Sequence, residues 1–108
     1  MDEAHDVFTA IAAPVRREML RRMAGGEVPV TELAESLGMS LSAVSQHLAI
    51  LREAGLVTQR KQGRQRLYRT DPEPLRAVSQ WLDFYAPFWS DRLGALTKHL
   101  EETRGDQA

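Results

Sequence analysis

Hydroxyl and amide side chains recur on one face of a helix predicted to follow residue 40. Ser45 and Gln46 come three and four positions after Ser42, a spacing that places all three on one helix face. Hydroxyl and amide groups can hydrogen-bond to base edges in the major groove of DNA, and glutamine suits the edge of adenine. We therefore predict that this stretch contacts DNA. The predicted contacts are Ser40, Ser42, Ser45, Gln46, His47 and Arg52.

A basic stretch follows shortly afterwards in the sequence. Residues 60–69 hold five basic residues and no acidic one. Arginine at a hairpin tip can bind phosphate or enter a narrow, A·T-rich minor groove, where it adds affinity and salt dependence more than sequence choice. We predict DNA contacts here too, although a charged stretch can be simply a solvated surface. The predicted contacts are Arg60, Lys61, Arg64 and Arg66.

Other chemistry is poorly supported by these residues. Ser45 and His47 are two positions apart, so they point in different directions on a helix and cannot form a nucleophile and base pair. Neither a glycine-rich phosphate loop nor a nucleophile elbow is present, and the chain has no cysteine. We predict that the protein is not an enzyme. For each polar residue alone the alternative is a solvated position, and for His47 it is a hydrogen bond within the domain.

The elements that must position these residues can be placed from periodicity and capping. Helices are expected over residues 3–12 and 14–24, then over 32–37 with Thr31 as N-cap, and up to residue 54 with Ser40 as N-cap. Strands are expected over 56–62 and 64–70 around Gly63, with a possible tiny strand near 28–30. A last helix is expected over 72–103, kinked or broken at Pro87. The order predicts one mainly α domain over residues 1–108 with a small β-hairpin.

The spacing of three residues favours a helix-turn-helix over residues 31–54. Ala34 allows two helices to approach closely, Gly38 permits a left-handed backbone in the turn, and Val44 packs between the helices. A chance helical hairpin is the alternative, but the hairpin over 56–70 follows in register as a wing. The fold class is therefore a winged helix-turn-helix. The remaining apolar positions of its inner face are Leu33, Leu37, Leu41, Leu48 and Leu51.

Aromatic residues are concentrated in the predicted last helix. Five of them fall in the nine positions 81–89, and an apolar stripe continues to Leu100. A helix that is apolar on more than one side needs more than one partner. We expect one side to cover the domain's own core and the other to meet a second copy of the chain. The alternatives are that all the aromatics form the core of a monomer, or that they line a pocket for an apolar effector.

The chain resembles the ArsR/SmtB family of bacterial winged-helix repressors, in a branch without cysteine. The resemblance is carried by residues 13–23 (APVRREMLRRM), by residues 31–57, in which LSAVSQHLAILREAGLV is most specific, and by the wing RKQGRQRLYR. It implies a repressor that binds a palindromic operator as a homodimer, with contacts from Ser42, Ser45 and Gln46. Many relatives carry lysine or arginine at the position of Ala49, so one phosphate contact is missing.

The resemblance also implies that the first and last helices form the dimer. A two-fold dimer would place two reading helices about 34 Å apart, one turn of DNA. The predicted interface residues are Phe8, Ile11, Trp81, Tyr85, Phe88, Trp89, Leu93, Leu96 and Leu100.

Some members of that family sense metals through residues on the last helix. His99 and Glu102 match the later half of such a site, but the earlier half would fall on Ala86 and Phe88, which are not ligands. Zinc takes about four ligands, and nothing in the spacing makes His5 one of them. We therefore predict no metal and no cofactor, with a metal-responsive sensor as the alternative.

Charge and hydropathy bear on partners and location. The net charge is −1, and the intact basic wing favours double-stranded DNA as partner over a protein-interaction module that has lost DNA binding. The N-terminal residues lack the pattern of a signal peptide, and no apolar stretch approaches the roughly 20 residues that span a bilayer. We expect a cytoplasmic protein without membrane contact.

Overall fold

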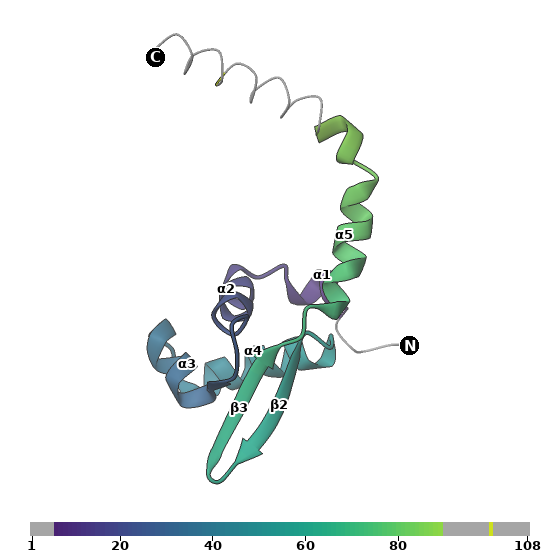
Figure 1. Cartoon of the computed structure of the whole chain (residues 1–108). Coiled ribbons are helices and arrows are strands. Elements are labelled where there is room, and N and C mark those ends of the chain that lie inside the picture. Colours follow the sequence, from purple (N-terminus) through teal and green to yellow (C-terminus); the bar gives the residue numbers. More distant parts are fainter. Residues whose placement is uncertain (1–5, 90–99, 101–108) are drawn as a thin grey trace. The chain divides into compact units, whose positions relative to one another are not determined.

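The computed structural model describes residues 6–89 and residue 100. The chain divides into two compact units, Met1–Val78 and Ser79–Ala108. The predicted winged helix-turn-helix is confirmed as a mainly helical fold with a small antiparallel sheet (Figure 1). The elements are α1 (Val7–Ala10), α2 (Pro14–Arg22), β1 (Val28–Pro29), α3 (Val30–Leu37), α4 (Leu41–Glu53), β2 (Val57–Gln62), β3 (Gln65–Thr70), the 3-10 helix η1 (Glu73–Leu75) and α5 (Arg76–Asp83).

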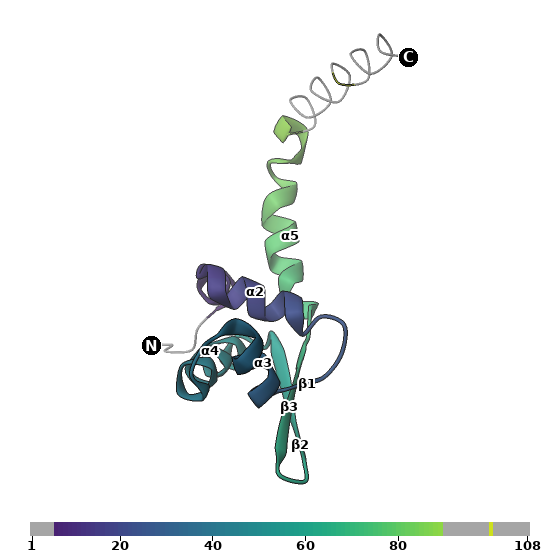
Figure 2. The same ribbon diagram turned by 90° about the vertical axis from the view of Figure 1, so that its left-hand side faces the viewer.

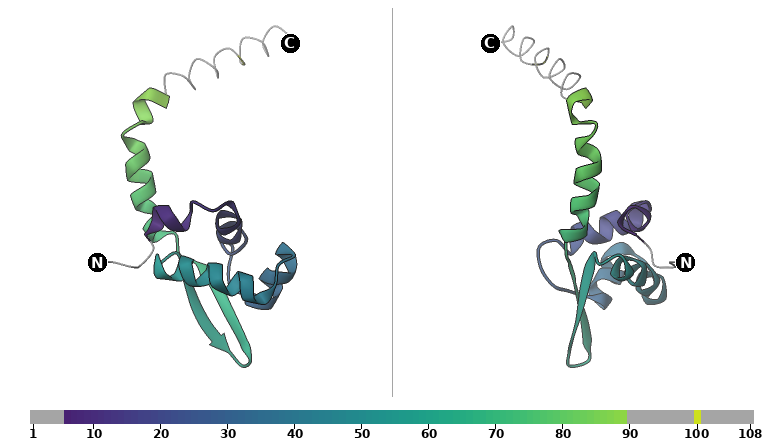
Figure 3. Two further views of the ribbon diagram at one scale, coloured as in Figure 1. Left: turned by 180° about the vertical axis from the view of Figure 1, so that it is seen from behind. Right: turned by 90° about the vertical axis from the view of Figure 1, so that its right-hand side faces the viewer.

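The sheet consists of three antiparallel strands in the order β1-β3-β2 (Figure 2). Gly63 forms the turn between β2 and β3 at φ 62°, a left-handed conformation that glycine adopts without steric cost. The hairpin tip lies away from α2, α3 and α4 in every view (Figure 3). Its basic residues therefore surround an exposed turn.

The core of the first unit lies between the helices and one face of the sheet. The largest fully buried side chains are Met19, Met23, Leu33, Val44, Leu48, Leu51 and Leu56. The sequence placed Leu41 on the same apolar face, and this prediction is wrong because its side chain is 48% exposed. Leu41 lies in the first turn of α4. The helical spacing of apolar residues includes this position, but the buried core does not extend to it.

The turn between α3 and α4 is built from local signals. Gly38 adopts φ 65° and ends α3, and Ser40 accepts a hydrogen bond from the Ala43 amide at 3.1 Å as the N-cap of α4. Ala34 and Val44 are both buried at the helix crossing. Thr31 is not the N-cap of α3. The helix begins at Val30 with Pro29 as N-cap, because β1 runs directly into it.

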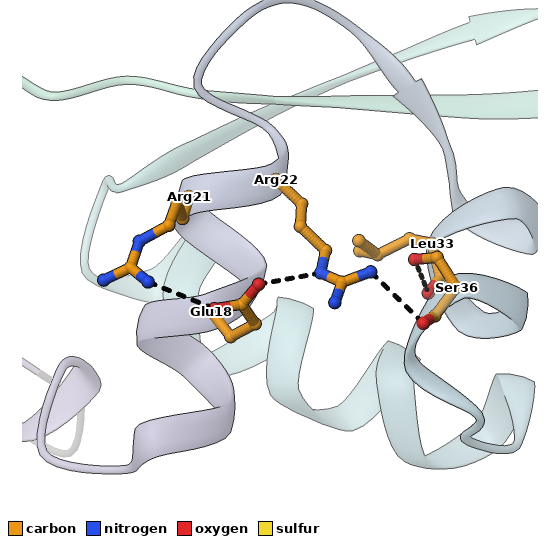
Figure 4. Close-up of polar contacts among 5 residues, drawn as sticks. All are labelled: Glu18, Arg21, Arg22, Leu33 and Ser36. Atoms are coloured by element: carbon orange, nitrogen blue, oxygen red, sulfur yellow. Dashed lines mark hydrogen bonds and ion pairs between the residues drawn. The ribbon is translucent and has the colours of Figure 1, made fainter.

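An arginine joins α2 to α3 on the surface of this unit (Figure 4). Arg22 donates to a carboxylate oxygen of Glu18 at 2.9 Å and to the backbone carbonyl of Ser36 at 3.2 Å. Ser36 turns its own hydroxyl to the Leu33 carbonyl at 2.9 Å. These contacts hold the end of α3 against α2 and so help to fix the helix pair that carries the turn.

The aromatic segment begins in α5 and continues past it. A turn at 84–85 follows Asp83, and residues 86–89 are helical again. Pro87 has no N–H to donate to the carbonyl of Asp83, and it lies in the first turn of the renewed helix, where that loss costs little. The ring of Tyr85 contacts those of Trp81 and Phe84, with centroids 5.5 and 4.9 Å apart.

Side chains of the predicted dimer interface are largely exposed in this single copy. Trp81 is 54% exposed, and Tyr85, Phe88, Trp89 and Leu100 are exposed as well. Leu93 and Leu96 lie outside the described residues, as do His5, His99 and Glu102.

Candidate nucleic-acid interface

Helix α4 presents opposite faces to the core and to solvent. Val44, Leu48 and Leu51 are buried, whereas Ser42, Ser45, Gln46 and Ala49 are exposed. The hydroxyl of Ser40 accepts the capping hydrogen bond from the Ala43 amide. The exposed face therefore offers two hydroxyls and an amide, with Arg52 one turn further along.

His47 lies at the edge of this face and contacts α2. Its Nδ1 is 3.2 Å from Nη1 of Arg16. A guanidinium only donates, so Nδ1 is the acceptor in this contact. Arg16 also donates to the carbonyls of Ala10 at 2.6 Å and Thr9 at 3.2 Å. His47 is therefore tied to the body of the domain, which was the alternative to DNA contact weighed for it.

The wing carries a hydrogen-bonded guanidinium on the side of α4. Arg66 donates from Nη1 to the side-chain carbonyl of Gln59 at 3.2 Å, and the Gln59 amide donates to the Tyr68 hydroxyl at 2.9 Å. Gln59 and Tyr68 are directly opposite each other in the β2–β3 ladder, and Tyr68 is only 7% exposed. A buried ring thus anchors the amide that orients Arg66. Lys61 and Arg64 are exposed near the tip.

A hollow of about 310 Å³ separates α4 from the hairpin. Its wall on the helix side includes Ser45, Ala49 and Arg52, and its wall on the sheet side consists of Gln59, Arg66 and Tyr68. The structure thus brings two of the predicted helix residues and one predicted wing residue to a common space. Gln59 and Tyr68 were not predicted from the sequence. The signal that could have found them is strand alternation, which places both on the face of the hairpin that meets α4.

Arg60 has a different environment from the other basic residues of the wing. It forms a two-pronged ion pair with Glu27, with Nε to Oε2 at 2.8 Å and Nη2 to Oε1 at 2.6 Å. Arg60 pairs with Leu67 in the ladder, one position from Gln59, so it lies on the opposite face of the hairpin. The ion pair gives Arg60 a structural role, the joining of β2 to the residue before β1, and its predicted DNA contact stays a prediction.

The ion pair makes stability depend on pH. The hydrogen bonds from Arg60 hold the pKa of the Glu27 carboxyl below its usual range. A lowered folded-state pKa stabilises the protein above the unfolded pKa, about 4.3 for glutamate, and this contribution is lost as the pH falls through the folded pKa. We expect Glu27→Gln to lower the melting temperature at pH 7, with a difference from the unchanged protein that shrinks below about pH 4.3. A difference that stays constant from neutral to acidic pH would contradict the pairing.

Two negative findings apply to the residues described. Among residues 6–89 and 100, no group of three or more histidine, aspartate or glutamate side chains is placed to hold a metal ion. In the same part of the chain, no helix has both the length and the apolar character needed to cross a membrane.

Comparisons with known proteins agree on one class. A family model described as "Bacterial regulatory protein, arsR family" matches residues 13–59. The HTH-type transcriptional regulator Rv2034 of Mycobacterium tuberculosis is 40% identical over 99 residues, 92% of this chain and 89% of that protein. The HTH-type transcriptional repressor SmtB of the same species is 41% identical over 69 residues, 64% of this chain but only 51% of that protein. A solved structure, the ArsR-like transcriptional regulator from Rhodococcus sp. RHA1, superposes with a TM-score of 0.69 at 30% identity, covering 89% of this chain and 88% of that one.

Proposed function

The chain belongs to the ArsR family of bacterial regulatory proteins and is a DNA-binding transcriptional regulator, and we propose that it represses a promoter by binding a palindromic operator as a homodimer. The observation that carries the proposal is the exposed polar face of α4 beside a basic hairpin. A major groove admits one helix, and a hairpin next to it can reach the phosphates or the adjacent minor groove. Repression then follows from occupation of the promoter.

The residues divide into two groups by the part of DNA that they contact. Ser42, Ser45 and Gln46 carry the short polar groups that suit base edges. Cations suit phosphate, which fixes position and affinity without reading sequence. The phosphate contacts that we propose are Arg52, Lys61, Arg64 and Arg66. Ser40 and His47 support α4 through the contacts described above.

The exposed aromatics support the proposed homodimer. Phe8 on α1 is exposed, as are Trp81, Tyr85, Phe88 and Trp89, and Ile11 is half-buried. Large exposed apolar side chains mark an interaction surface, and a second copy presents the same side chains. A two-fold dimer gives two α4 helices that can reach successive turns of DNA. We place the protein in the cytoplasm, where a bacterial regulator meets its DNA.

The test is selection of bound duplexes from random DNA by the purified protein, followed by band shifts at several salt concentrations. We expect a palindromic consensus. Gln46→Ala should relax the preference at one base pair of each half-site by about 5- to 150-fold, the equivalent of one good side-chain–base contact. Arg64→Ala removes one cation from each subunit of the dimer, so it should instead weaken binding to all duplexes alike and lower the magnitude of the slope of log K against log salt by about two.

Two outcomes would reject the proposal. Absence of binding to any duplex at low salt contradicts a DNA-binding function for this chain. If Gln46→Ala weakens all duplexes equally and Arg64→Ala changes the consensus, the division of the two groups is wrong. Circular dichroism of both variants separates these outcomes from unfolding.

A further inference from the structure

We propose that the hollow between α4 and the hairpin is a site for one backbone phosphate, held between Arg52 and Arg66 with Gln59 as the residue that positions Arg66. This inference rests on the proposed DNA-binding function and names the part of the nucleic acid that enters the space. The space exists because residue 49 is alanine. Ser45, Ala49 and Arg52 are spaced four and three positions apart along one helix face, and the short middle side chain leaves about 310 Å³ open in front of it.

The charges around the hollow favour an anion. One guanidinium comes from the helix and one from the hairpin, and no acidic side chain is among the residues that line the space. Guanidinium groups bind phosphate oxygens through short, charge-assisted hydrogen bonds and are less strongly hydrated than ammonium groups. The hydroxyl of Ser45 at the same wall supplies a further donor.

The position of the hollow favours a backbone phosphate over a base. In the proposed complex α4 lies in a major groove and the hairpin reaches the adjacent minor groove. A single sugar-phosphate strand separates these two grooves. The space between the helix and the hairpin must therefore straddle that strand, and the two arginines face it from either side.

Gln59 prepares this site before DNA arrives. Its carbonyl accepts from Arg66 and its amide donates to the hydroxyl of Tyr68, whose ring is buried in the core. The guanidinium is thus oriented in the free protein, which reduces the entropy lost when it binds a ligand. A positioning role predicts that loss of the Gln59 side chain weakens binding without removing the charge that contacts phosphate.

The experiment uses the duplex obtained by selection, with single phosphates replaced in turn by uncharged methylphosphonates. The unchanged protein should bind more weakly when the replaced phosphate is the one that lies in the hollow. There is one such phosphate in each half-site. Arg66→Gln and Ala49→Leu, which respectively remove a guanidinium and fill the space, should bind more weakly and be insensitive to replacement at that phosphate. Both should also lower the magnitude of the slope of log K against log salt by about two, one for each half-site.

Two further variants complete the test. Gln59→Leu should weaken binding of the dimer about 5- to 150-fold, the cost of ordering one side chain in each subunit, while keeping the salt slope and the sensitivity to that phosphate. Arg69→Gln removes the same charge from an exposed position on the same strand that does not line the hollow, and it should keep the sensitivity to that phosphate.

The results separate this inference from the proposed function. If the unchanged protein binds no DNA, the proposed function fails. If it binds DNA but Arg66→Gln and Ala49→Leu respond to every phosphate replacement as the unchanged protein does, only the phosphate site is refuted. The site is also refuted if Arg69→Gln and Arg66→Gln lower the salt slope equally and neither alters the sensitivity to replacement of any single phosphate. In that case the arginines act only through their general positive charge.

Discussion

Replacement of Leu48 by alanine is expected to lower the free energy of unfolding by about 2–5 kcal/mol. Leu48 is 1% exposed and packs in the core beneath the exposed face of α4. Its removal loses buried apolar surface and leaves a cavity that the surrounding helices close only in part. Because small domains are stable by only about 5–15 kcal/mol, this one change removes a large share of the total.

Leu41→Ala is the matched control for this prediction. It makes the same change on the same helix at a side chain that is 48% exposed. Urea unfolding followed by circular dichroism should give a much smaller loss for Leu41→Ala, with the same dependence on denaturant for both variants. Equal losses at the two positions would mean that the inner and outer faces of α4 are assigned incorrectly.

Replacement of Arg16 by methionine is expected to cost about 1–3 kcal/mol and to loosen α1. Helix α1 has four residues, far below the length at which an isolated helix is stable in water. The Arg16 guanidinium binds the carbonyls of Thr9 and Ala10 at the end of that helix and also contacts His47 on α4. Methionine keeps much of the apolar stem and removes the donor to the Ala10 carbonyl and to His47, while the Thr9 carbonyl keeps its hydrogen bond from the Ala12 amide.

Arg21→Met is the corresponding control on α2. Arg21 is exposed, and its contact with Glu18 is 3.4 Å long, so its loss should cost less than about 0.5 kcal/mol. Hydrogen exchange is the sharper readout, because Arg16→Met should speed exchange at residues 9–12 and in the first half of α4. Protection unchanged there, together with a loss of stability no greater than that of Arg21→Met, would contradict the role given to Arg16.

Features set by neighbouring residues could be predicted from the sequence. The turn at Gly38, the cap at Ser40 and the hairpin turn at Gly63 each depend on a few adjacent positions, and all three are present. The cap of α3 was misplaced because β1 is two residues long and ends where the helix starts. The exposure of Leu41 was missed because periodicity shows which residues share a helix face but not how far the core extends along that face.

Features that depend on strand register could not be predicted. Glu27 and Arg60 are separated by 33 positions, and their pairing requires β1 to lie beside β3. The contact of Arg66 with Gln59 likewise needs the register of the hairpin. As a result, the basic residues of the wing looked equivalent in the sequence, whereas the structure gives Arg60 and Arg66 different partners on opposite faces.

The most direct test of the central claim, that α4 and the hairpin bind DNA together, is a map of amide chemical shifts in the labelled protein as the selected duplex is added. The account predicts the largest changes at residues 42–49 of α4 and at residues 61–66 of the hairpin. A scrambled duplex at the same salt concentration should move the hairpin signals more than those of α4. Changes centred on other parts of the described chain, with α4 unaffected by the selected duplex, would contradict the account.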